Sequence, residues 1–516
     1  MSESKISFHA WKILAILSGI STMVLYAETM LVPAIPHLIN EFDITYSISS
    51  WILSSYLISG AISVPIAGKL SDIYGRKKIL LIVMMIYTLG VIGGALSVDT
   101  YSLLFSRTVQ GIGMSVFPIV FAIVQDQFPR NKVSIAQGTL ASMFAFGGVL
   151  GLLVGGNVIE HFGWRMTFYS VIPVSMLLII IIWRYVQAKE PTELESTQQK
   201  HKGLSNKEYL AKERRQHTST KDTSNSGKSK LDVKGAIFLA ISITAFLSAL
   251  SFVQSTSDNN TELQKSFSIP WEILLLSLAG FSSLTAFILV EKRSSSPLID
   301  LKLVAHKPIL LSNIIVIIWG ICTFAIFQTI PILVQSPVIT GSIGGNAIDA
   351  ANIQLPFSVT SLVFGPTSGL IISKIGSSRV TLIGAIVTTI SILTTLIFHT
   401  NAIQLAINLA LVGVGLALLN VGQLNINTTS VSPRNIGVSL GINTLLRYVG
   451  SAIGPAVVGM LMQSNQNVIK TADGISTAFP SKESYNFIFL FILVTVAITI
   501  LLSIKLAHTK RESEFF

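Results

Sequence analysis

Long hydrophobic runs alternate with short polar stretches along the whole chain. A run of 18 or more apolar residues can cross the ~30 Å hydrocarbon core of a membrane as one helix. The pattern predicts an all-α polytopic membrane protein with fourteen spanning helices. The expected spans are 11–35, 48–68, 78–97, 102–125, 134–157, 166–186, 233–254, 270–290, 309–333, 347–372, 379–398, 403–427, 435–462 and 485–507.

Composition and charge agree with this prediction. The 516 residues are 50% hydrophobic and 12% charged, whereas soluble domains carry about 25% charged residues. The net charge of +11 comes largely from Lys and Arg in alternate short loops and in one polar segment. This asymmetry is typical of cytoplasmic loops. It predicts a multi-pass protein of the cell membrane with both termini cytoplasmic, and it explains the basic charge without a nucleic-acid partner. The single cysteine, Cys322, cannot form an intrachain disulfide.

The chain repeats itself at an offset of about 300 residues. Three spacings recur in order: Gly68-x3-Asp72-x2-Gly75 as Gly369-x3-Ser373-x2-Gly376, Pro129–Asn131 as Pro433–Asn435, and Gly138-x8-Gly147-x3-Gly151 as Gly441-x8-Gly450-x3-Gly454. Small residues that let helices pack closely explain many of these glycines one by one, but not three ordered spacings. Internal repeats of this kind are found in many transporters, with the substrate site between the repeats.

The repeat divides the chain into five parts. We expect an N-terminal six-helix bundle, a flexible cytoplasmic linker, two additional membrane helices, a cytoplasmic loop, and a C-terminal six-helix bundle with a short cytoplasmic tail. Their ranges are 1–186, 187–232, 233–290, 291–308 and 309–516. The linker is rich in charged residues, Ser, Thr and Gln, so it cannot bury a core.

The motifs resemble those of the major facilitator superfamily, and most of all its fourteen-span branch of drug:proton antiporters. The loop Gly68-Lys-Leu-Ser-Asp72-Ile-Tyr-Gly75-Arg76 is similar to the signature between spans 2 and 3. Arg107-Thr-Val-Gln110-Gly111 resembles the motif of span 4. The resemblance implies two six-helix bundles that work by alternating access.

The resemblance also implies a conformational latch. In the family, the Asp and Arg of the signature loop join an acid at the end of span 4 and face the helix that opens the equivalent span of the other half. Here that latch comprises Gly68, Asp72, Gly75, Arg76 and Asp126, and the facing helix begins near Asn435. An acid beside a helix N-terminus is favoured by the free N–H groups.

The fifth span resembles the antiporter motif of the family. The glycines that fit are Gly138, Gly147, Gly151, Gly155 and Gly156. Leu152 stands where the motif has proline, and Pro455 occupies the equivalent place in the second half. This departure leaves open a transporter of another solute class, such as a metabolite, a lipid-like molecule or a siderophore.

Ionisable side chains deep in a span cost at least ~2.5 kcal/mol on insertion scales and are functional by default. Glu28 and Arg107 lie at similar depth in the first and fourth spans. We expect Glu28 to carry the proton and Arg107 to pair or compete with it. A fixed structural ion pair is the alternative.

Aromatic and amide side chains in other spans suit a largely apolar ligand with some polar atoms. The expected cavity residues are Tyr26, Gln110, Trp319, Phe327, Gln328, Asn420, Gln423, Asn443 and Arg447. Ordinary hydrogen bonding between helices, worth ~0.6 kcal/mol on average, is the alternative for each amide.

Together these features predict a proton-driven exporter of small amphipathic organic compounds, working as a monomer in the lipid bilayer. No cofactor, metal site or enzymatic activity is expected, and the proton gradient is the energy source. The alternatives are the other solute classes above and a membrane sensor that does not transport.

Overall fold

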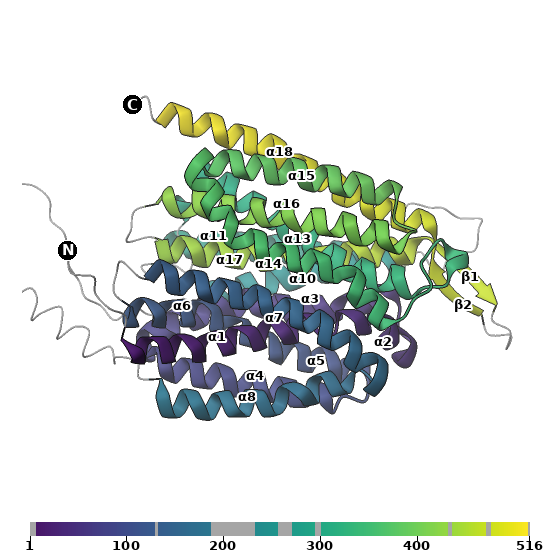
Figure 1. The fold of residues 1–516 in the computed structure, drawn as a ribbon, viewed down its shortest axis with the longest axis horizontal. Helices are drawn as coiled ribbons and strands as arrows, with labels where there is room; N and C mark the ends of the chain where they lie inside the picture. The colour runs from purple at the N-terminus through teal and green to yellow at the C-terminus, as the bar shows by residue number, and fades with distance from the viewer. Residues whose placement is uncertain are drawn as a thin grey trace, which may run out of the picture.

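The computed structural model describes residues 7–128, 133–186, 233–255, 271–294, 301–431, 436–470 and 476–513. The linker expected at 187–232, Pro129–Asn131 and Pro433–Asn435 lie outside these residues. Nearly parallel and antiparallel helices make up the molecule (Figure 1). Thirteen of the described helical segments are long and apolar enough to cross a membrane. The prediction of an all-α polytopic membrane protein is confirmed.

The helices of the first half pack into one bundle. In chain order they are α1 (Phe8–Thr29), α2 (Ile35–Phe42), α3 (Tyr46–Tyr74), α4 (Arg76–Ala95), α5 (Thr100–Gly111), α6 (Val116–Gln127), α7 (Val133–Phe162) and α8 (Arg165–Tyr185), with 3-10 turns η1 (Val32–Ala34) and η2 (Ile112–Ser115). The first predicted span is broken at η1, because Pro33 and Pro36 lack backbone N–H donors. The fourth is one span formed by α5, η2 and α6.

The helices of the second half pack in the same way. They are α12 (Leu301–Ala305), α13 (Lys307–Gln335), α14 (Ala347–Ile375), α15 (Ser377–Ile397), α16 (Ala402–Thr429), α17 (Ile436–Ser464) and α18 (Lys482–Ser513), with a 3-10 turn η3 (Val338–Thr340). Between α17 and α18 lies an antiparallel hairpin of β1 (Gln466–Lys470) and β2 (Ser476–Pro480). The hydrophobic pattern predicted only a loop between the spans 435–462 and 485–507.

The repeat is visible in the packing. Helix α7 lies along α1, and α17 lies along α13. At Gly147 the carbonyl oxygen of Thr22 fills the place of a β-carbon, and at Gly450 the carbonyl oxygen of Ile317 does the same. Only glycine allows these close backbone contacts.

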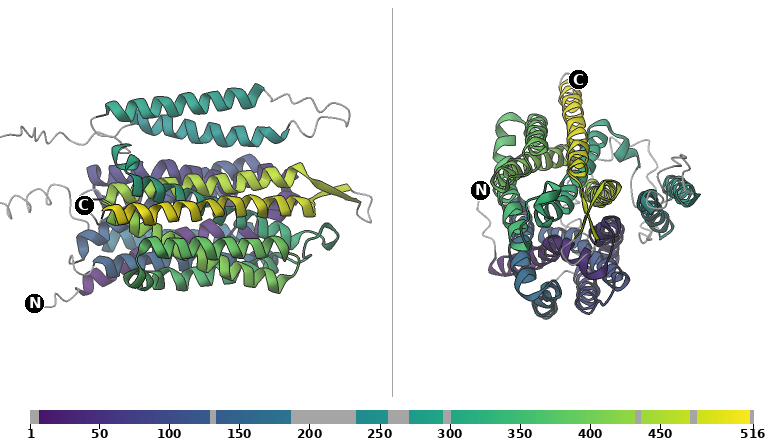
Figure 2. Two further views of the ribbon diagram at one scale, coloured as in Figure 1. Left: turned by 90° about the horizontal axis from the view of Figure 1, so that it is seen from above. Right: turned by 90° about the vertical axis from the view of Figure 1, so that its right-hand side faces the viewer.

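The two additional helices lie beside the bundles rather than inside them (Figure 2). They are α10 (Val233–Ser255) and α11 (Trp271–Arg293). Two hydrogen bonds from serine side chains link the described parts of α10 and α11. Ser242 donates to the Gly280 carbonyl at 3.1 Å, and Ser283 donates to the Phe238 carbonyl at 2.7 Å. Helix α10 also packs on α3 and α17. Of α10, the described apolar part is Lys234–Phe246, shorter than a full span.

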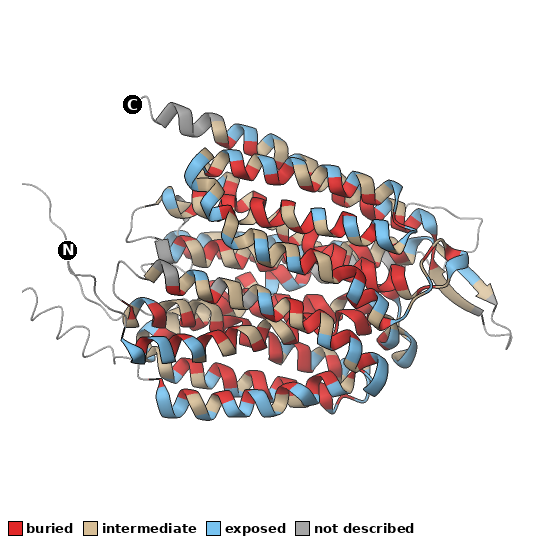
Figure 3. Ribbon diagram, viewed as in Figure 1, coloured by how far each residue is buried: buried red, intermediate tan, exposed pale blue. Residues whose placement is uncertain are grey.

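Helix α1 begins and α18 ends at the same end of the molecule, which we call the terminal end (Figure 1). The opposite end carries the β-hairpin, and we call it the far end. Buried residues lie along the helix contacts, and exposed residues lie on the outer faces (Figure 3). Many exposed side chains are large and apolar, for example Leu177, Leu278 and Ile390, as expected for a surface that faces lipid.

Candidate functional site

Glu28 lies in the last turn of α1, just before the break at η1. It is 5% exposed. Its Oε2 atom has no hydrogen-bond partner among the residues that the structure describes. Tyr56 of α3, Arg107 of α5, and Arg447 and Tyr448 of α17 interact electrostatically with this carboxyl group. A buried acid is thus surrounded by groups from both halves.

Arg107 is fully buried and held by the first half. Its Nε donates to the Ile52 carbonyl at 3.1 Å, and its Nη1 donates to Gln110 Oε1 at 2.7 Å and to the Ala27 carbonyl at 3.3 Å. The guanidinium carbon lies 4.4 Å from the Tyr56 ring centroid. Its Nη2 has no partner among the described side chains and backbone groups. Gln110 therefore orients Arg107.

Arg447 belongs to the other half and sits among aromatic rings. Its Nη2 donates to Tyr448 Oη at 3.2 Å. Its guanidinium carbon lies 4.8 Å from the Tyr448 ring centroid, 5.8 Å from that of Phe117 and 5.9 Å from that of Trp319. Phe117 comes from the first half, so the rings also span the two halves.

Glu28 forms no direct ion pair with either arginine in the part of the chain that is described. From the sequence we expected Arg107 to pair or compete with Glu28. In the structure Arg447 of the other half also interacts electrostatically with Glu28. Sequence reasoning missed Tyr56, Phe117 and Tyr448, because nothing in their spacing indicates that three separate helices meet near Glu28 and Arg447.

The amides of the second half form their own network. Asn443 Nδ2 donates to Gln423 Oε1 at 3.1 Å and to Asn313 Oδ1 at 3.0 Å. Asn427 also donates to Asn313 at 2.9 Å, and Gln423 donates to Asn420 at 3.2 Å. Trp319 Nε1 donates to the Leu416 carbonyl at 3.0 Å. These bonds link α13, α16 and α17, so the structure places Asn420, Gln423 and Asn443 in an interhelical network.

Phe327 and Gln328 lie farther along α13, toward the far end. The Phe327 ring meets those of Phe324 and Phe357 edge-on, with centroids 5.4 and 5.6 Å apart. Gln328 Nε2 donates to Ser49 Oγ of the first half at 3.1 Å. Gln328 therefore stands at the contact between the halves, whereas Phe327 packs within the second half.

Tyr26 is separated from this group. Its hydroxyl lies 3.2 Å from Ser170 Oγ on α8, and it lines a lateral cavity between α1, α7 and α8. The structure therefore brings Gln110, Arg107, Glu28 and Arg447 together, and places Tyr26 on another face of α1.

The residues expected to form a latch meet at the terminal end. Arg76 donates to the Asp126 carboxylate and to the Ala122 carbonyl, and its Nη2 lies 3.9 Å from Asp72 Oδ1. Gly75 joins α3 to α4 with φ +95°. At Gly68 a β-carbon would lie 3.8 Å from Pro118. Asn435, near which the facing helix begins, lies outside the described residues, so the contact between the halves there stays a prediction.

The glycines of the fifth span divide between two faces of α7. Gly147, Gly151 and Gly155 lie against the backbone of α1. Gly156 faces α14, where a β-carbon would lie 2.5 Å from Ala351 Cβ. Gly138 has no atom within 4 Å of the position a β-carbon would take.

Among the residues that the structure describes, six hydrogen bonds join the two halves toward the far end. Their pairs are Tyr46 N–Gln463, Tyr46 Oη–Ala478 O, Ser54–Ala452 O, Gln328–Ser49, Gln335–Pro33 O and Ala347 N–Glu160, at 2.9–3.3 Å. The far end is thus closed around the site. Within the described ranges, no group of three or more His, Cys, Asp or Glu residues could hold a metal ion.

A model of the Major Facilitator Superfamily matches residues 17–356 and 332–514. The chain belongs to this family, as its motifs predicted.

Two similar proteins come from Bacillus subtilis (strain 168). The chain is 26% identical over 430 residues to Multidrug resistance protein 3, covering 83% of this chain and 74% of that protein. It is 23% identical over 366 residues to the uncharacterized MFS-type transporter YhcA, covering 70% of this chain but only 59% of that relative's length. The protein is therefore a multi-pass membrane protein of the superfamily.

A solved structure shares the fold. It is that of a bacterial homolog of the human lysosomal transporter Spinster, described as inward-facing and unoccupied. It has a TM-score of 0.61 and 14% identity, and covers 98% of each chain. At this identity the likeness concerns the fold alone.

Proposed function

We propose that the protein exports small amphipathic organic compounds in exchange for protons, with Glu28 as the proton-carrying group. The observation that carries the proposal is the buried Glu28 carboxyl, with an unpartnered oxygen, between arginines of opposite halves. The relative named Multidrug resistance protein 3 supports the substrate class.

The position of Glu28 links proton binding to the contact between the halves. As a carboxylate it attracts Arg447 across the interface, and this attraction is strong where water is excluded. A proton on Glu28 removes the attraction and so favours separation of the halves. A ligand that occupies the site between them competes with the same contact, which is what exchange by alternating access requires.

The closed far end fits one state of this cycle. If the terminal end is cytoplasmic, as the loop charges predict, the conformation is inward-facing. The protein would then work in the cell membrane with both termini in the cytoplasm, as a monomer.

The test uses purified protein in liposomes with an imposed pH gradient and a panel of lipophilic dyes. Wild type should accumulate dye against its gradient, and Glu28→Gln should lose this accumulation while still exchanging dye down its gradient. Glu272→Gln, in the first turn of α11, is the matched control and should behave as wild type. Full gradient-driven accumulation by Glu28→Gln would remove Glu28 from the carrier role.

A second candidate function follows from the charge of the site. Two arginines face one carboxyl group, so the site carries net positive charge when all three are ionised. This favours a solute with an acidic group over a cation. The dye panel therefore includes cationic, neutral and anionic members, and transport of anionic dyes alone would support this candidate.

A further inference from the structure

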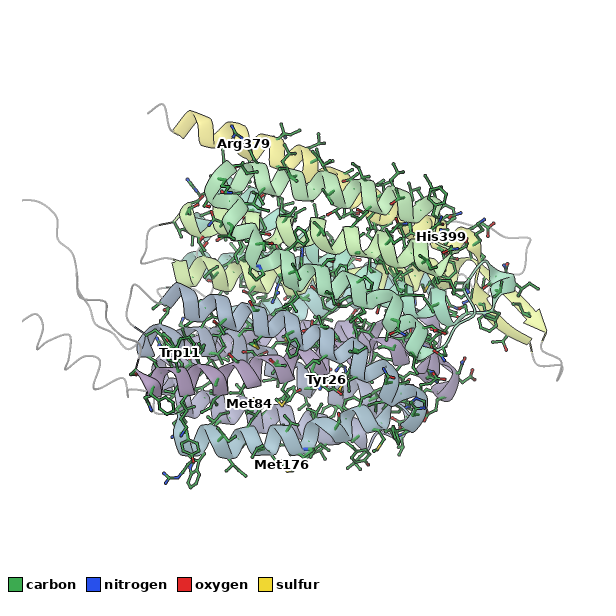
Figure 4. All side chains as sticks on the ribbon, in the orientation of Figure 1. Trp11, Tyr26, Met84, Met176, Arg379 and His399 are labelled. Atoms are coloured by element: carbon green, nitrogen blue, oxygen red, sulfur yellow. The ribbon has the colours of Figure 1, made fainter. Side chains whose placement is uncertain are left out.

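A lateral cavity runs along α1 on a face away from Glu28. Its volume is about 710 Å³, and α1, α7 and α8 form its walls. It extends from Trp11 to Tyr26, which is about 22 Å at 1.5 Å per residue. Figure 4 labels these two residues near the terminal end and farther along the bundle. The cavity is therefore a long groove.

The groove opens on the side of the bundle. Val154 and Val174, on its α7 and α8 walls, are 38% and 46% exposed. Leu177 and Ile180 beside it on α8 are 57% and 60% exposed. In a membrane-spanning chain such a surface faces hydrocarbon, so the occupant must enter from the bilayer.

The floor of the groove carries a polar group without a partner. Ser18 is 8% exposed, and its Oγ has no hydrogen-bond partner among the described residues. It lies in the lining, six residues beyond Lys12 on α1, or about 9 Å along the helix axis. A buried hydroxyl without a partner is costly, so a carbonyl group of the occupant would stabilise it.

Two cations and an aromatic ring lie at the terminal ends of α1 and α8, beyond the lining of the groove itself. Lys12 Nζ lies 3.6 Å from the Tyr185 ring centroid, and Arg184 Cζ lies 6.0 Å from the same centroid. Neither cation forms an ion pair within the described part of the chain. Trp11 lines the groove beside them. Tryptophan and tyrosine are typical of the headgroup level of a membrane, and basic residues there attract anionic lipids.

We propose that the groove binds an acidic phospholipid of the leaflet at the terminal end. One acyl chain lies along α1 toward Tyr26, the phosphate lies at Lys12 and Arg184, and an ester carbonyl accepts a hydrogen bond from Ser18. The order of these groups along α1 matches the order of phosphate, ester and chain in such a lipid. The site is separate from Glu28 and does not depend on the proposed transport activity.

The test places the full-length protein in lipid nanodiscs with two photoactivatable probes that share one tail. One is phosphatidylglycerol and the other is phosphatidylcholine, each with a diazirine in the tail. Labelled peptides are identified by mass spectrometry. Wild type should be labelled on groove residues of α1, α7 and α8, several-fold more by the acidic probe.

Gly19→Leu fills the groove. A β-carbon at Gly19 would meet only Leu178 Cδ2, at 3.6 Å, so there is room for a side chain. This variant should lose the groove labelling, and Lys12→Ala should lose the preference for the acidic probe. Gly369→Leu, on α14 with nothing within 4 Å, is the matched control and should keep both.

Ala15→Leu fills the same groove and replaces Gly19→Leu if that variant does not fold. Equal labelling of wild type by both probes would show ordinary boundary lipid and overturn the proposal. Groove labelling that survives in a folded, filled variant would overturn it as well.

Discussion

At the scale of single residues, the candidate site depends on charges that lie far apart in the sequence. Glu28 and Arg447 are contributed by α1 and α17, and neither has a direct ion-pair partner within the described residues. A carboxyl group without a direct ion-pair partner can bind or release a proton without breaking a salt bridge. Arg107 differs, because its backbone and Gln110 contacts fix it in the first half.

The backbone conformation at Gly75 gives a physical reason for a glycine at this position. Its φ of +95° lies in a region that other residues rarely adopt. Gly75→Ala should therefore cost about 1–3 kcal/mol of stability. The midpoint of thermal unfolding in detergent should fall, while Gly369→Ala, inside a helix with free space around it, should not lower it. Equal shifts in both variants would contradict the backbone explanation.

At the scale of elements, two equivalent helix contacts close the far end. Gly156 of α7 meets Ala347 and Ala351 of α14. Gly459 of α17 meets Tyr46 and Ser50 of α3, where a β-carbon would lie 2.8 Å from the Tyr46 carbonyl oxygen. The two contacts use the same positions of the repeat, about 300 residues apart. We call the α7–α14 contact and the α3–α17 contact the two seams between the halves. At each seam one glycine lets the two helices approach closely.

Gly459→Leu should prevent this closure, because the side chain cannot fit against α3. Spin labels at Val98→Cys and Ile403→Cys, in a Cys322→Ala background, report the far-end separation by pulsed electron resonance. These positions are 80% and 72% exposed. The variant should show a longer-distance population than the unmutated pair, and Gly369→Leu should not. An unchanged distance distribution in Gly459→Leu would refute the closure at this contact.

At the scale of the whole molecule, the described parts of the additional helices lie over the contact between α3 and α17. Helix α10 packs on α3 and α17, which form one contact between the halves, while α7 and α14 form the other. The pair therefore covers the α3–α17 side of the molecule (Figure 2). This arrangement makes the two seams unequal, although the bundles repeat each other.

The orientation of the molecule can be tested with a thiol reagent that does not cross membranes. Phe8→Cys lies at the terminal end and Val338→Cys at the far end, and the native residues are 87% and 67% exposed. In a Cys322→Ala background, Val338→Cys should react in intact cells and Phe8→Cys only after permeabilisation. The reverse pattern would place the termini outside.

Much of the fold follows from local sequence. Hydrophobic runs indicate spans because hydrocarbon demands helices with internally satisfied backbones. The glycine spacings indicated two related halves, and the structure shows α7 on α1 and α17 on α13 in the same way. The motif also grouped Asp72, Arg76 and Asp126, which lie near one another, and their role as a latch stays a prediction. Each of these features is encoded by a short sequence pattern that can be recognised within a single segment of the chain.

The tertiary structure decided what surrounds each chemical group. The sequence alone determined that Glu28 is an acid inside a span, but not that Arg447 of the other half would interact with it as well as Arg107. It grouped Tyr26 with the cavity, whereas packing turned Tyr26 toward Ser170 in the lateral groove. The physical reason is that helical periodicity fixes which residues share a face, while the neighbour of that face depends on how distant helices pack.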